Sequence, residues 1–576
     1  MDTHNLSLII TLLLIFVSAI FGGLVARYFK LPALLGYIAS GVLFGNILSR
    51  SVDTLFLSQI ADVGVTLLLF TIGVEFSFYR LRKAIHSVLW PALFQIFMTV
   101  CIVLLLCWLL QFGFMPSLYI GIAAGLSSTA IVVKVLSEKG ELESVAGELS
   151  IGWLIMQDLA VIPIMILLPT LLKVQAVGTS SISSILGAIG ISIAESIVAI
   201  LAILFLGRLG VPRILDAMAK LKNREIFLLS VIGIVFLAAL VTYAVGLSAA
   251  LGAFIAGLLI SETSQNHAIF AEVRPLRDLF AVVFFVSLGM VLPINQVFGM
   301  LPTILLLAAV ILLLKWFLVF GLSRYLGNHR KTAFLVALSI AQMSEFGFII
   351  AREGVILGVL TQERYIFLVA LTFVTMFFGT TLFSQGNTVY YWFYKTLGRF
   401  IPNMFSSKLE SKPNTEELQI SNHIVICGYG RVGKYIGRAL EMGKIPYLVI
   451  DYNQSTVAHL RAKSIPVVYG DPADKDVLDY AQVDYARSVV IAIPDRHTQE
   501  LIISNAQTLN KHIRIICRTH HEEDQGYLKS LGVQTIVQPE FEAALSVISR
   551  LLPEYGLAPE DIAGKISRLK IEHGLG

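Results

Sequence analysis

The sequence is poor in cysteine and in charge, and each shortage excludes a class of protein. Its four cysteines among 576 residues show neither metal-ligand spacing nor a disulfide framework, so we interpret them as buried free thiols. Only 14% of the residues are charged, and the net charge of +4 includes no basic cluster with interleaved aromatics. Nucleic acid is therefore not an expected partner. With 56% hydrophobic residues, the chain is also too apolar for a soluble globular protein and suits a multi-span membrane protein.

Apolar runs make up most of the chain. They follow one another from Ser7 to about Tyr394, each of the roughly 17 to 25 residues that a bilayer span requires. The composition after Arg399 is that of a soluble protein. The first run lacks the basic flank and the A-x-A-like site of a cleaved signal, so we expect it to remain as a span. We predict thirteen spans, near residues 7–26, 33–49, 58–77, 87–110, 117–136, 146–172, 182–207, 225–243, 246–261, 278–293, 298–323, 332–351 and 365–386.

Basic residues are unevenly divided between the connections that join these spans. If the N-terminus is outside, the inside connections carry most of them, including Arg80, Arg82 and Lys83. This positive-inside pattern places the soluble C-terminal part in the cytoplasm. The outside connections hold only Arg50, Lys173, Arg352 and Arg364.

Two segments far apart in the chain are similar to each other. LPALLGYIASGVLFGN at 31–46 and GLSAALGAFIAGLLIS at 246–261 share small residues around an aromatic. They fall in the second and ninth predicted spans, which would cross the membrane in opposite directions. Inverted repeats are common in secondary transporters, where the site lies at mid-membrane between the copies. The alternative is that small residues occur only because helices pack closely there.

Polar residues interrupt two spans in corresponding halves of the chain. The fifth span contains GLSSTAIVVK, with Ser127, Ser128 and Thr129, and the twelfth contains VALSIAQMSEFGFIIA, with Glu345. Broken helices expose backbone carbonyls and helix ends that coordinate cations, and hydroxyls add neutral oxygens. The two interruptions thus indicate one transport site. The alternative is that the hydroxyls only bond back to carbonyls of their own helix.

Single ionisable residues lie deep in two other spans. Asp158 is the only one in the stretch Ile151 to Leu172, and Lys315 is the only one in TILLLAAVILLLKWFLVFGL. Such residues cost several kcal/mol in lipid unless paired or hydrated, and they usually mark an ion path or proton relay. We expect Lys315 to pair with an anion at similar depth, and we favour Asp158 over Glu345. The alternative is a permanent ion pair that only holds two helices together.

The segments LLLFTIGVE, GLSSTAIVVK, MQDLAVIPI, GLSAALGAFIAGLLIS and FFVSLGM, in this order, resemble the monovalent cation:proton antiporter 2 family, specifically its Kef-type branch. The resemblance implies a homodimer in the bacterial inner membrane, crossed discontinuous helices, and exchange of potassium or sodium for protons by an elevator-like movement. It implies transport-site roles for a set of residues that comprises Asp158, Gln157, Ser127, Ser128, Thr129, Lys315, Glu345 and Glu75.

Two of these residues carry open alternatives. Electrogenic relatives have two adjacent aspartates where this chain has Gln157 and Asp158, so one carboxylate fewer indicates one-for-one, electroneutral exchange. Lys315 could still contribute a second proton. Glu75, at the end of its span beside Arg80 and Arg82, could instead be an interfacial anchor.

The soluble part carries a dinucleotide-binding pattern. HIVICGYG predicts a strand that leads into a helix, and Gly428, Gly430 and Gly433 form G-x-G-x-x-G between them. Asp451 ends the next predicted strand at the distance expected for a ribose-binding acid. Alternating strands and helices indicate a doubly wound parallel sheet. The expected nucleotide-binding residues are Gly428, Tyr429, Gly430, Arg431, Val432, Gly433, Asp451, Gly470, Asp471 and Arg518; Asp471 and the two arginines could instead be surface or capping residues.

This part resembles TrkA-N, the nucleotide-binding half of modules that regulate potassium conductance (RCK). The resemblance implies AMP or NAD(H) as a regulatory ligand and an ancillary regulatory protein as a further candidate partner, and some relatives respond to glutathione. We find no His or Lys placed for hydride transfer, so the nucleotide is a ligand and the protein is not expected to be an enzyme. We expect a transmembrane exchange domain at 1–394, a linker at 395–422, the TrkA-N/RCK domain at 423–540 and a helical tail at 541–576.

Together these patterns predict a polytopic α-helical membrane protein of the sodium/proton antiporter type with inverted repeats, followed by an α/β Rossmann-type domain. The predicted function is antiport of a monovalent cation, potassium in preference to sodium, against protons. The alternative is a nucleotide-gated potassium efflux channel, but the TVGYG-like loop of a potassium filter is absent from the sequence. A membrane-tethered oxidoreductase and a sensor that transports nothing are further alternatives.

Overall fold

The computed structural model describes two compact units. The residues that it describes are 3–29, 31–47, 63–64, 66–67, 69–71, 73–74, 78–142, 144–176, 182–221, 223–245, 249–261, 263, 266–397, 420–519 and 523–572. The first unit comprises Met1–Lys134, Leu149–Leu322 and Val336–Ser384, and the second comprises Val135–Glu148, Ser323–Leu335 and Gln385–Gly576. Short segments between the apolar helices therefore belong with the soluble domain in the second unit.

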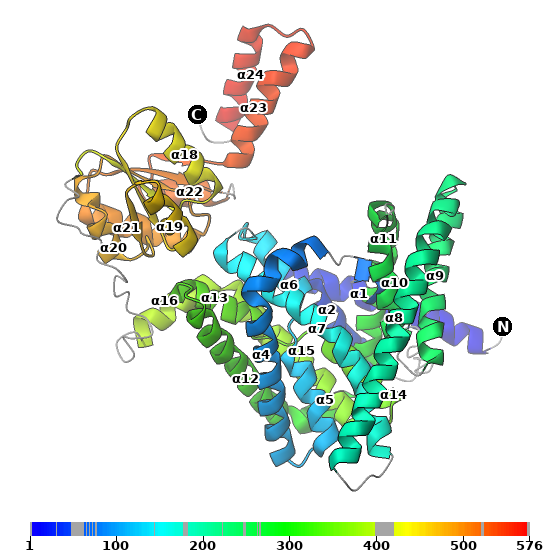
Figure 1. Cartoon of the computed structure of the whole chain (residues 1–576). Helices are drawn as coiled ribbons and strands as arrows, with labels where there is room; N and C mark the ends of the chain where they lie inside the picture. Colours follow the sequence, from blue (N-terminus) through cyan, green and yellow to red (C-terminus); the bar gives the residue numbers. More distant parts are fainter. Residues whose placement is uncertain are drawn as a thin grey trace. The chain divides into compact units, whose positions relative to one another are not determined.

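The first unit is built from helices, because a chain in lipid must satisfy its backbone polar groups internally. Within the described ranges, seven helices are long and apolar enough to span a membrane, and three shorter apolar helices accompany them. The membrane fold is thus confirmed, while the count of thirteen spans stays a prediction. The helices are α1 (Thr3–Tyr28), α2 (Ala33–Ile47), α4 (Phe78–Leu109), α5 (Phe114–Gly125), α6 (Thr129–Glu138), α7 (Val145–Ala176), α8 (Ile182–Lys220), α9 (Arg224–Ala244), α10 (Ala249–Ser261), α11 (Asn266–Met290), α12 (Ile294–Tyr325), α13 (Arg330–Ile340), α14 (Phe346–Ile356) and α15 (Gln362–Ser384) (Figure 1).

The two similar segments make matching close crossings. In α2, a Cβ added at Gly41 would overlap the carbonyl oxygen of Val286, and Gly289 of α11 meets the α2 backbone in the same way. In α10, Gly257 makes an equivalent approach to Gly73. Small residues permit such backbone contact between membrane helices. Both copies of the repeat therefore use a glycine pair to pack against a second helix.

Both predicted interruptions are present. The chain leaves helical conformation between Gly125, where α5 ends, and Thr129, where α6 begins. It does so again between Ile340, the end of α13, and Phe346, the start of α14. Each break creates a helix C-terminus with exposed carbonyls and a helix N-terminus with exposed N–H groups.

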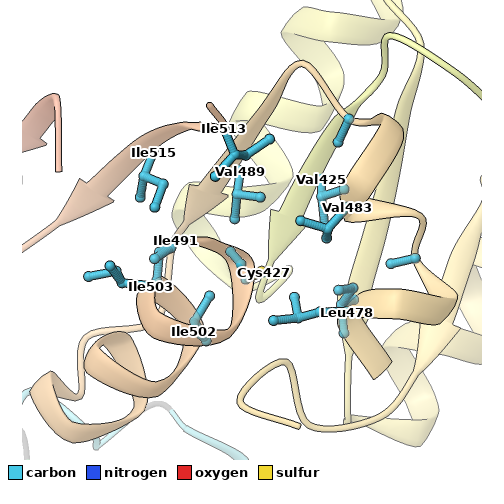
Figure 2. Packing of buried hydrophobic residues seen from close by; sticks show 14 of the residues in the cluster. Val425, Cys427, Leu478, Val483, Val489, Ile491, Ile502, Ile503, Ile513 and Ile515 are labelled. Atoms are coloured by element: carbon cyan, nitrogen blue, oxygen red, sulfur yellow. The ribbon is translucent and has the colours of Figure 1, made fainter. Parts of the chain in front are cut away.

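The second unit contains a six-stranded parallel sheet of order β3-β2-β1-β4-β5-β6. Apolar β-branched runs form the strands, and Figure 2 shows Val489 and Ile491 among the side chains that pack with Ile502 and Ile503 of α21. The expected Rossmann-type domain is confirmed. Its elements are β1 (Ile424–Cys427), α18 (Arg431–Met442), β2 (Tyr447–Asp451), α19 (Gln454–Ala462), β3 (Val467–Tyr469), α20 (Lys475–Tyr480), η3 (Val483–Tyr485), β4 (Ser488–Ile491), α21 (Arg496–Leu509), β5 (Arg514–Arg518), α22 (Glu523–Ser530) and β6 (Thr535–Val537).

Three further helices complete the second unit. Helix α16 spans Gly386–Leu397 and contacts α21. Helices α23 (Pro539–Glu554) and α24 (Pro559–Glu572) pack on each other at the end of the chain. The segments 135–148 and 323–335 also belong to this unit, and the second of them carries side chains that reach the sheet.

Candidate functional site

The ammonium group of Lys315 lies at both helix breaks of the first unit. This side chain of α12 is 0% exposed. An ammonium has three N–H donors, and each finds one oxygen here. The acceptors of Lys315 Nζ are the carbonyl of Leu126 at 2.7 Å, Oγ of Ser127 at 2.8 Å and the carbonyl of Gln342 at 2.7 Å. Lys315 thus joins the break after α5 to the break after α13.

The favoured pairing of Lys315 with Asp158 is therefore wrong. A carboxylate was expected because a buried cation needs negative charge nearby. At the two breaks, the ends of helices provide this negative charge in place of a carboxylate. Leu126 caps the C-terminus of α5, and Gln342 follows the C-terminus of α13. Helix C-termini carry partial negative charge, and two of them meet at this ammonium.

Asp158 of α7 lies at a helix N-terminus instead. Its Oδ2 accepts a hydrogen bond of 2.7 Å from Oγ1 of Thr129, the first residue of α6. A helix N-terminus carries partial positive charge and favours a carboxylate. The Asp158 side chain is half-buried rather than enclosed.

The remaining polar residues of the breaks differ in what they contact. Ser127 donates a hydrogen bond of 2.7 Å to the carbonyl of Ile340 in the other break, so the alternative of bonding back to its own helix is wrong for this residue. Ser128 accepts from the N–H of Ile131 in the first turn of α6, which is a local contact. Glu345 is the N-cap residue of α14 and is 7% exposed, within hydrogen-bonding reach of Ser128. Five of the predicted transport residues, Ser127, Ser128, Thr129, Lys315 and Glu345, thus lie at the two breaks, with Asp158 bonded to Thr129.

Gln157 is held by a residue that the sequence analysis missed. Its Nε2 donates to Oε1 of Gln95 in α4 at 2.6 Å. The Nε2 of Gln95 in turn donates to Oγ1 of Thr99 and to the carbonyl of Gly125 at the end of α5, both at 3.1 Å. Gln95 is 0% exposed in the middle of an apolar span, and that isolated amide in WPALFQIFMTV was the available signal. Glu75, another predicted transport residue, lies outside the described residues.

The glycine-rich turn of the second unit has the geometry that its pattern predicts. Gly428 adopts φ +91°, where a side chain would be strained. A Cβ at Gly433 would overlap the carbonyl oxygen of Gly428, so only glycine permits this approach of helix to strand. Gly430 caps the N-terminus of α18, and Arg431 and Val432 form its first turn. The turn therefore presents a helix N-terminus suited to phosphate.

Asp451 lies at the end of β2 beside this turn. Its Oδ2 accepts from the N–H of Tyr429 and its Oδ1 from the N–H of Asn453, both at 2.7 Å. Burial raises the pKa of Asp451, although these N–H groups oppose the rise. The carboxylate is thus oriented toward the glycine-rich turn, where a ribose hydroxyl would bind.

Asp471, expected at the nucleotide, has a lysine partner in the structure. It follows Gly470 at the end of β3, and its Oδ2 lies 3.3 Å from Nζ of Lys331. Its Oδ1 accepts from the N–H of Ala473. Burial raises the pKa of Asp471, but Lys331, the N–H of Ala473 and His329 together outweigh it and hold this pKa below its usual range. Burial lowers the pKa of Lys331, but Asp471, with further contributions from groups that include Asp495, outweighs that effect and raises it. The pair is therefore charged.

Arg518 ends β5, where burial lowers its pKa and Glu540 opposes that effect. It lies at the same carboxyl edge of the sheet as Asp451 and Asp471, since all strands are parallel. Arg431 is exposed in the first turn of α18. The fold therefore collects the predicted nucleotide residues at one edge of the sheet, as the strand order requires.

These features define a class of protein. A helical membrane unit with two broken helices and a half-buried carboxylate bonded to one of them is typical of a secondary transporter, and a Rossmann-type domain with a glycine-rich turn accompanies it. The family models agree: residues 14–385 match the transmembrane sodium/hydrogen exchanger family and residues 424–539 match the TrkA-N domain. The chain belongs to the sodium/hydrogen exchanger family, and its resemblance to the Kef-type branch is confirmed.

Several relatives align along nearly all of the chain. YbaL of Escherichia coli (strain K12), named for cation/proton antiport, is 30% identical over 95% of this chain and 98% of its own length. The glutathione-regulated potassium-efflux system protein KefC of Escherichia coli O9:H4 (strain HS) is 28% identical over 97% of this chain and 87% of its own. The chloroplastic K(+) efflux antiporter 2 of Arabidopsis thaliana is 30% identical over 99% of this chain, which spans 48% of the plant protein.

Solved structures match the C-terminal part. The TrkA-N domain of inner membrane protein YbaL from Escherichia coli is 30% identical and covers 23% of this chain and 99% of its own, with a TM-score of 0.23. The Shewanella denitrificans Kef C-terminal domain in AMP-bound form is 26% identical and covers 27% of this chain and 93% of its own, with a TM-score of 0.24. The relatives are transporters, so the chain is a multi-pass membrane protein of the cation/proton antiporter class.

Proposed function

We propose that the protein exchanges potassium, in preference to sodium, for protons across the bacterial inner membrane, one ion for one proton. The observation that carries this proposal is the position of Asp158. It is half-buried, bonded to Thr129 at the start of α6, and separate from the Lys315 ammonium. A half-buried carboxylate at a helix N-terminus can alternately bind a proton or a metal ion.

The cation ligands in this proposal are oxygens around Asp158. Alkali cations prefer carboxylate, carbonyl and hydroxyl oxygens. The Asp158 carboxylate supplies charge, and the Thr129 hydroxyl turns its lone pairs to the ion when the proton leaves. Competition for the same carboxylate couples the two ions: the cation binds only after the proton is released.

The one-for-one stoichiometry is supported by the surroundings of two other residues. Gln157 replaces a second acid and is bonded to Gln95, so it adds no proton to the cycle. Lys315 donates all three of its N–H groups to the breaks. Loss of a proton would turn an amine lone pair toward a carbonyl oxygen, so Lys315 remains charged throughout the cycle.

The second unit provides regulation in this proposal. The glycine-rich turn, the N-terminus of α18 and Asp451 suit the phosphate and ribose of AMP or NAD(H). We further propose the division into an exchange domain (1–394), linker (395–422), TrkA-N/RCK domain (423–540) and tail (541–576), with the C-terminal domain cytoplasmic, assembly as a homodimer, and an ancillary regulatory protein as a further partner.

The test is proton flux in proteoliposomes under potassium or sodium gradients, with and without AMP or NADH. We expect either cation gradient to drive proton movement, potassium more strongly, and nucleotide to change the rate. A membrane potential should leave the exchange equilibrium unmoved, and a shift would reject one-for-one coupling. Potassium flux that ignores the proton gradient would support the channel alternative instead.

A second experiment changes the stoichiometry. Gln157→Asp restores the pair of adjacent acids, and Gln157→Asn keeps the residue neutral. We expect only the aspartate variant to become sensitive to membrane potential, because a second carboxylate can carry a second proton. Electroneutral exchange by the Gln157→Asp variant would contradict the role assigned to this position.

A further inference from the structure

Lys331 connects the first turn of α13 to the Rossmann-type sheet within the second unit. The side chain is 3% exposed, and Nζ makes three polar contacts in addition to a cation–π contact over the Tyr391 ring. It lies 3.3 Å from Oδ2 of Asp471 at the end of β3. It donates to the hydroxyl of Tyr391 in α16 at 2.7 Å and to Oγ1 of Thr498 in α21 at 3.0 Å. This network fixes the start of α13 to the carboxyl edge of the sheet.

His329 reaches the same edge two residues earlier. Its ring stacks on Tyr452, with centroids 5.5 Å apart and planes at 29°, and meets the edge of Tyr469 at 5.9 Å. Its Nδ1 accepts from the N–H of Lys331. Tyr452 directly follows Asp451, and Tyr469 ends β3. The imidazole therefore covers the two tyrosines that flank the ends of β2 and β3.

A nucleotide would need this edge as well. In doubly wound sheets, ligands bind outside the carboxyl ends of the strands near the switch point, which here lies between β1 and β4. Phosphate at the α18 N-terminus and ribose at Asp451 direct the base along β2 and β3, toward Tyr452 and Asp471. Those residues already hold His329 and Lys331.

We propose that the segment 326–331, which we term the docking turn, is an autoinhibitory competitor of an adenine nucleotide at the ends of β2 and β3. The inference rests on the nucleotide regulation proposed above and specifies its mechanism. Bound nucleotide displaces His329 and Lys331, and the docked turn lowers nucleotide affinity by the same factor, because coupling between two binding events is reciprocal.

The docking turn also leads to the transport site along one continuous helix. Helix α13 runs from Arg330 to Ile340, whose carbonyl accepts from Ser127. Lys315 then binds the carbonyl of Gln342, two residues further along. Release of the turn frees the start of the helix whose end forms one of the two breaks, which is how nucleotide binding changes the transport rate.

The test measures nucleotide affinity in the full-length protein in lipid nanodiscs, with NADH fluorescence as direct readout and AMP as competitor. We expect Lys331→Met and His329→Ala to bind roughly tenfold tighter or more, since apparent affinity rises with the fraction of competent state. Lys511→Met is the matched control, because this exposed lysine precedes β5 and therefore lies at the opposite, amino edge of the sheet. Its affinity should equal that of the unmodified protein.

A second measurement needs no variant. AMP should reduce hydrogen-exchange protection of residues 326–335 in the unmodified protein. If the contact is purely structural, this protection should be the same with and without AMP. Two results would contradict the proposed competition while leaving nucleotide regulation intact. One is equal or weaker NADH binding by the folded Lys331→Met variant, and the other is increased hydrogen-exchange protection with AMP. If neither AMP nor NADH binds the unmodified protein or the variants, the proposed nucleotide regulation fails and the competition fails with it.

Discussion

The two buried lysines within the described part of the chain occupy different regions and are neutralised in different ways. Lys315 of the membrane unit is 0% exposed and donates to three neutral oxygens. Lys331 of the second unit is 3% exposed and faces the Asp471 carboxylate together with two hydroxyls. One cation is balanced by helix ends and the other by a formal anion.

The difference shows what broken helices offer to the proposed transport site. Burying an ion pair is costly, and its partner carboxylate becomes fixed. In the membrane unit, the C-termini of α5 and α13 take the place of that carboxylate, and Asp158 instead accepts a hydrogen bond from Thr129 at the N-terminus of α6. In the second unit no transported ion needs Asp471, so it can form an ordinary ion pair with Lys331.

The largest effect should follow from removing the Asp158 carboxylate. Asp158→Asn keeps the size of the side chain but abolishes its charge, so it can hold neither a titrating proton nor a cation. We expect cation-driven proton flux in proteoliposomes to fall by about 100-fold or more, in the range typical for loss of a proton-transfer group.

Glu148→Gln is the control for this variant, because Glu148 is an exposed acid in the first turn of the same helix, α7. Its flux should be unchanged. Retained exchange by Asp158→Asn would refute the central assignment.

Replacing the lysine at the breaks should have the next largest effect. Lys315→Met leaves the carbonyls of Leu126 and Gln342 without their donor, at about 2 kcal/mol each. We expect the free energy of unfolding in detergent to fall by about 4 kcal/mol and transport to be lost as the breaks separate. Lys315→Arg keeps the charge and should recover part of both losses, because helix ends require a cation and not a particular shape. A stable, active Lys315→Met protein would show that the breaks do not depend on the ammonium.

Breaking the ion pair of the second unit should cost somewhat less. Lys331→Met leaves the Asp471 carboxylate buried without its cation, and such losses cost about 3 kcal/mol. Because the Asp158 site contains neither residue, exchange should persist while the unfolding midpoint falls. The double variant Lys331→Met/Asp471→Asn should recover stability relative to Lys331→Met, since no uncompensated charge remains. If Lys331→Met lost exchange activity without losing stability, Lys331 would belong to the transport cycle. The two lysines would then not differ in function.

The sequence analysis anticipated the breaks and the glycine-rich turn because their signals are local. Ser127 and Ser128 interrupt an aliphatic run, and Gly428 and Gly433 are needed by the backbone itself. The predicted partner of Lys315 was wrong. Polarity along a chain reveals a buried charge, but helix-end dipoles exist only after folding. The sequence therefore offered only acids at similar depth as partners, and we favoured Asp158 over Glu345.

Contacts between segments that are far apart in the chain likewise could not be predicted from the sequence. Gln95 was visible as an isolated amide, but its bond to Gln157 depends on how α4 and α7 pack. Asp471 was correctly placed at the carboxyl edge of the sheet, whereas its pairing with Lys331 links residues 140 positions apart, and local patterns carry no such information.

The smallest expected effect concerns pH and separates the two lysine sites once more, because only Lys331 has a histidine beside it. Burial lowers the pKa of His329 from 6.5 to about 4, with Lys331, Arg324 and Arg330 adding to the decrease and Asp471 opposing it. Between these values the unfolded chain binds more protons, so the free energy of unfolding rises with pH and falls on acidification. The loss should be at most about 1.4 kcal/mol per pH unit. His329→Gln should flatten the change in unfolding midpoint between pH 7 and pH 5, whereas the exposed His512→Gln should not. An unaltered acid dependence in His329→Gln would mean that this histidine is not neutral and enclosed at the sheet edge.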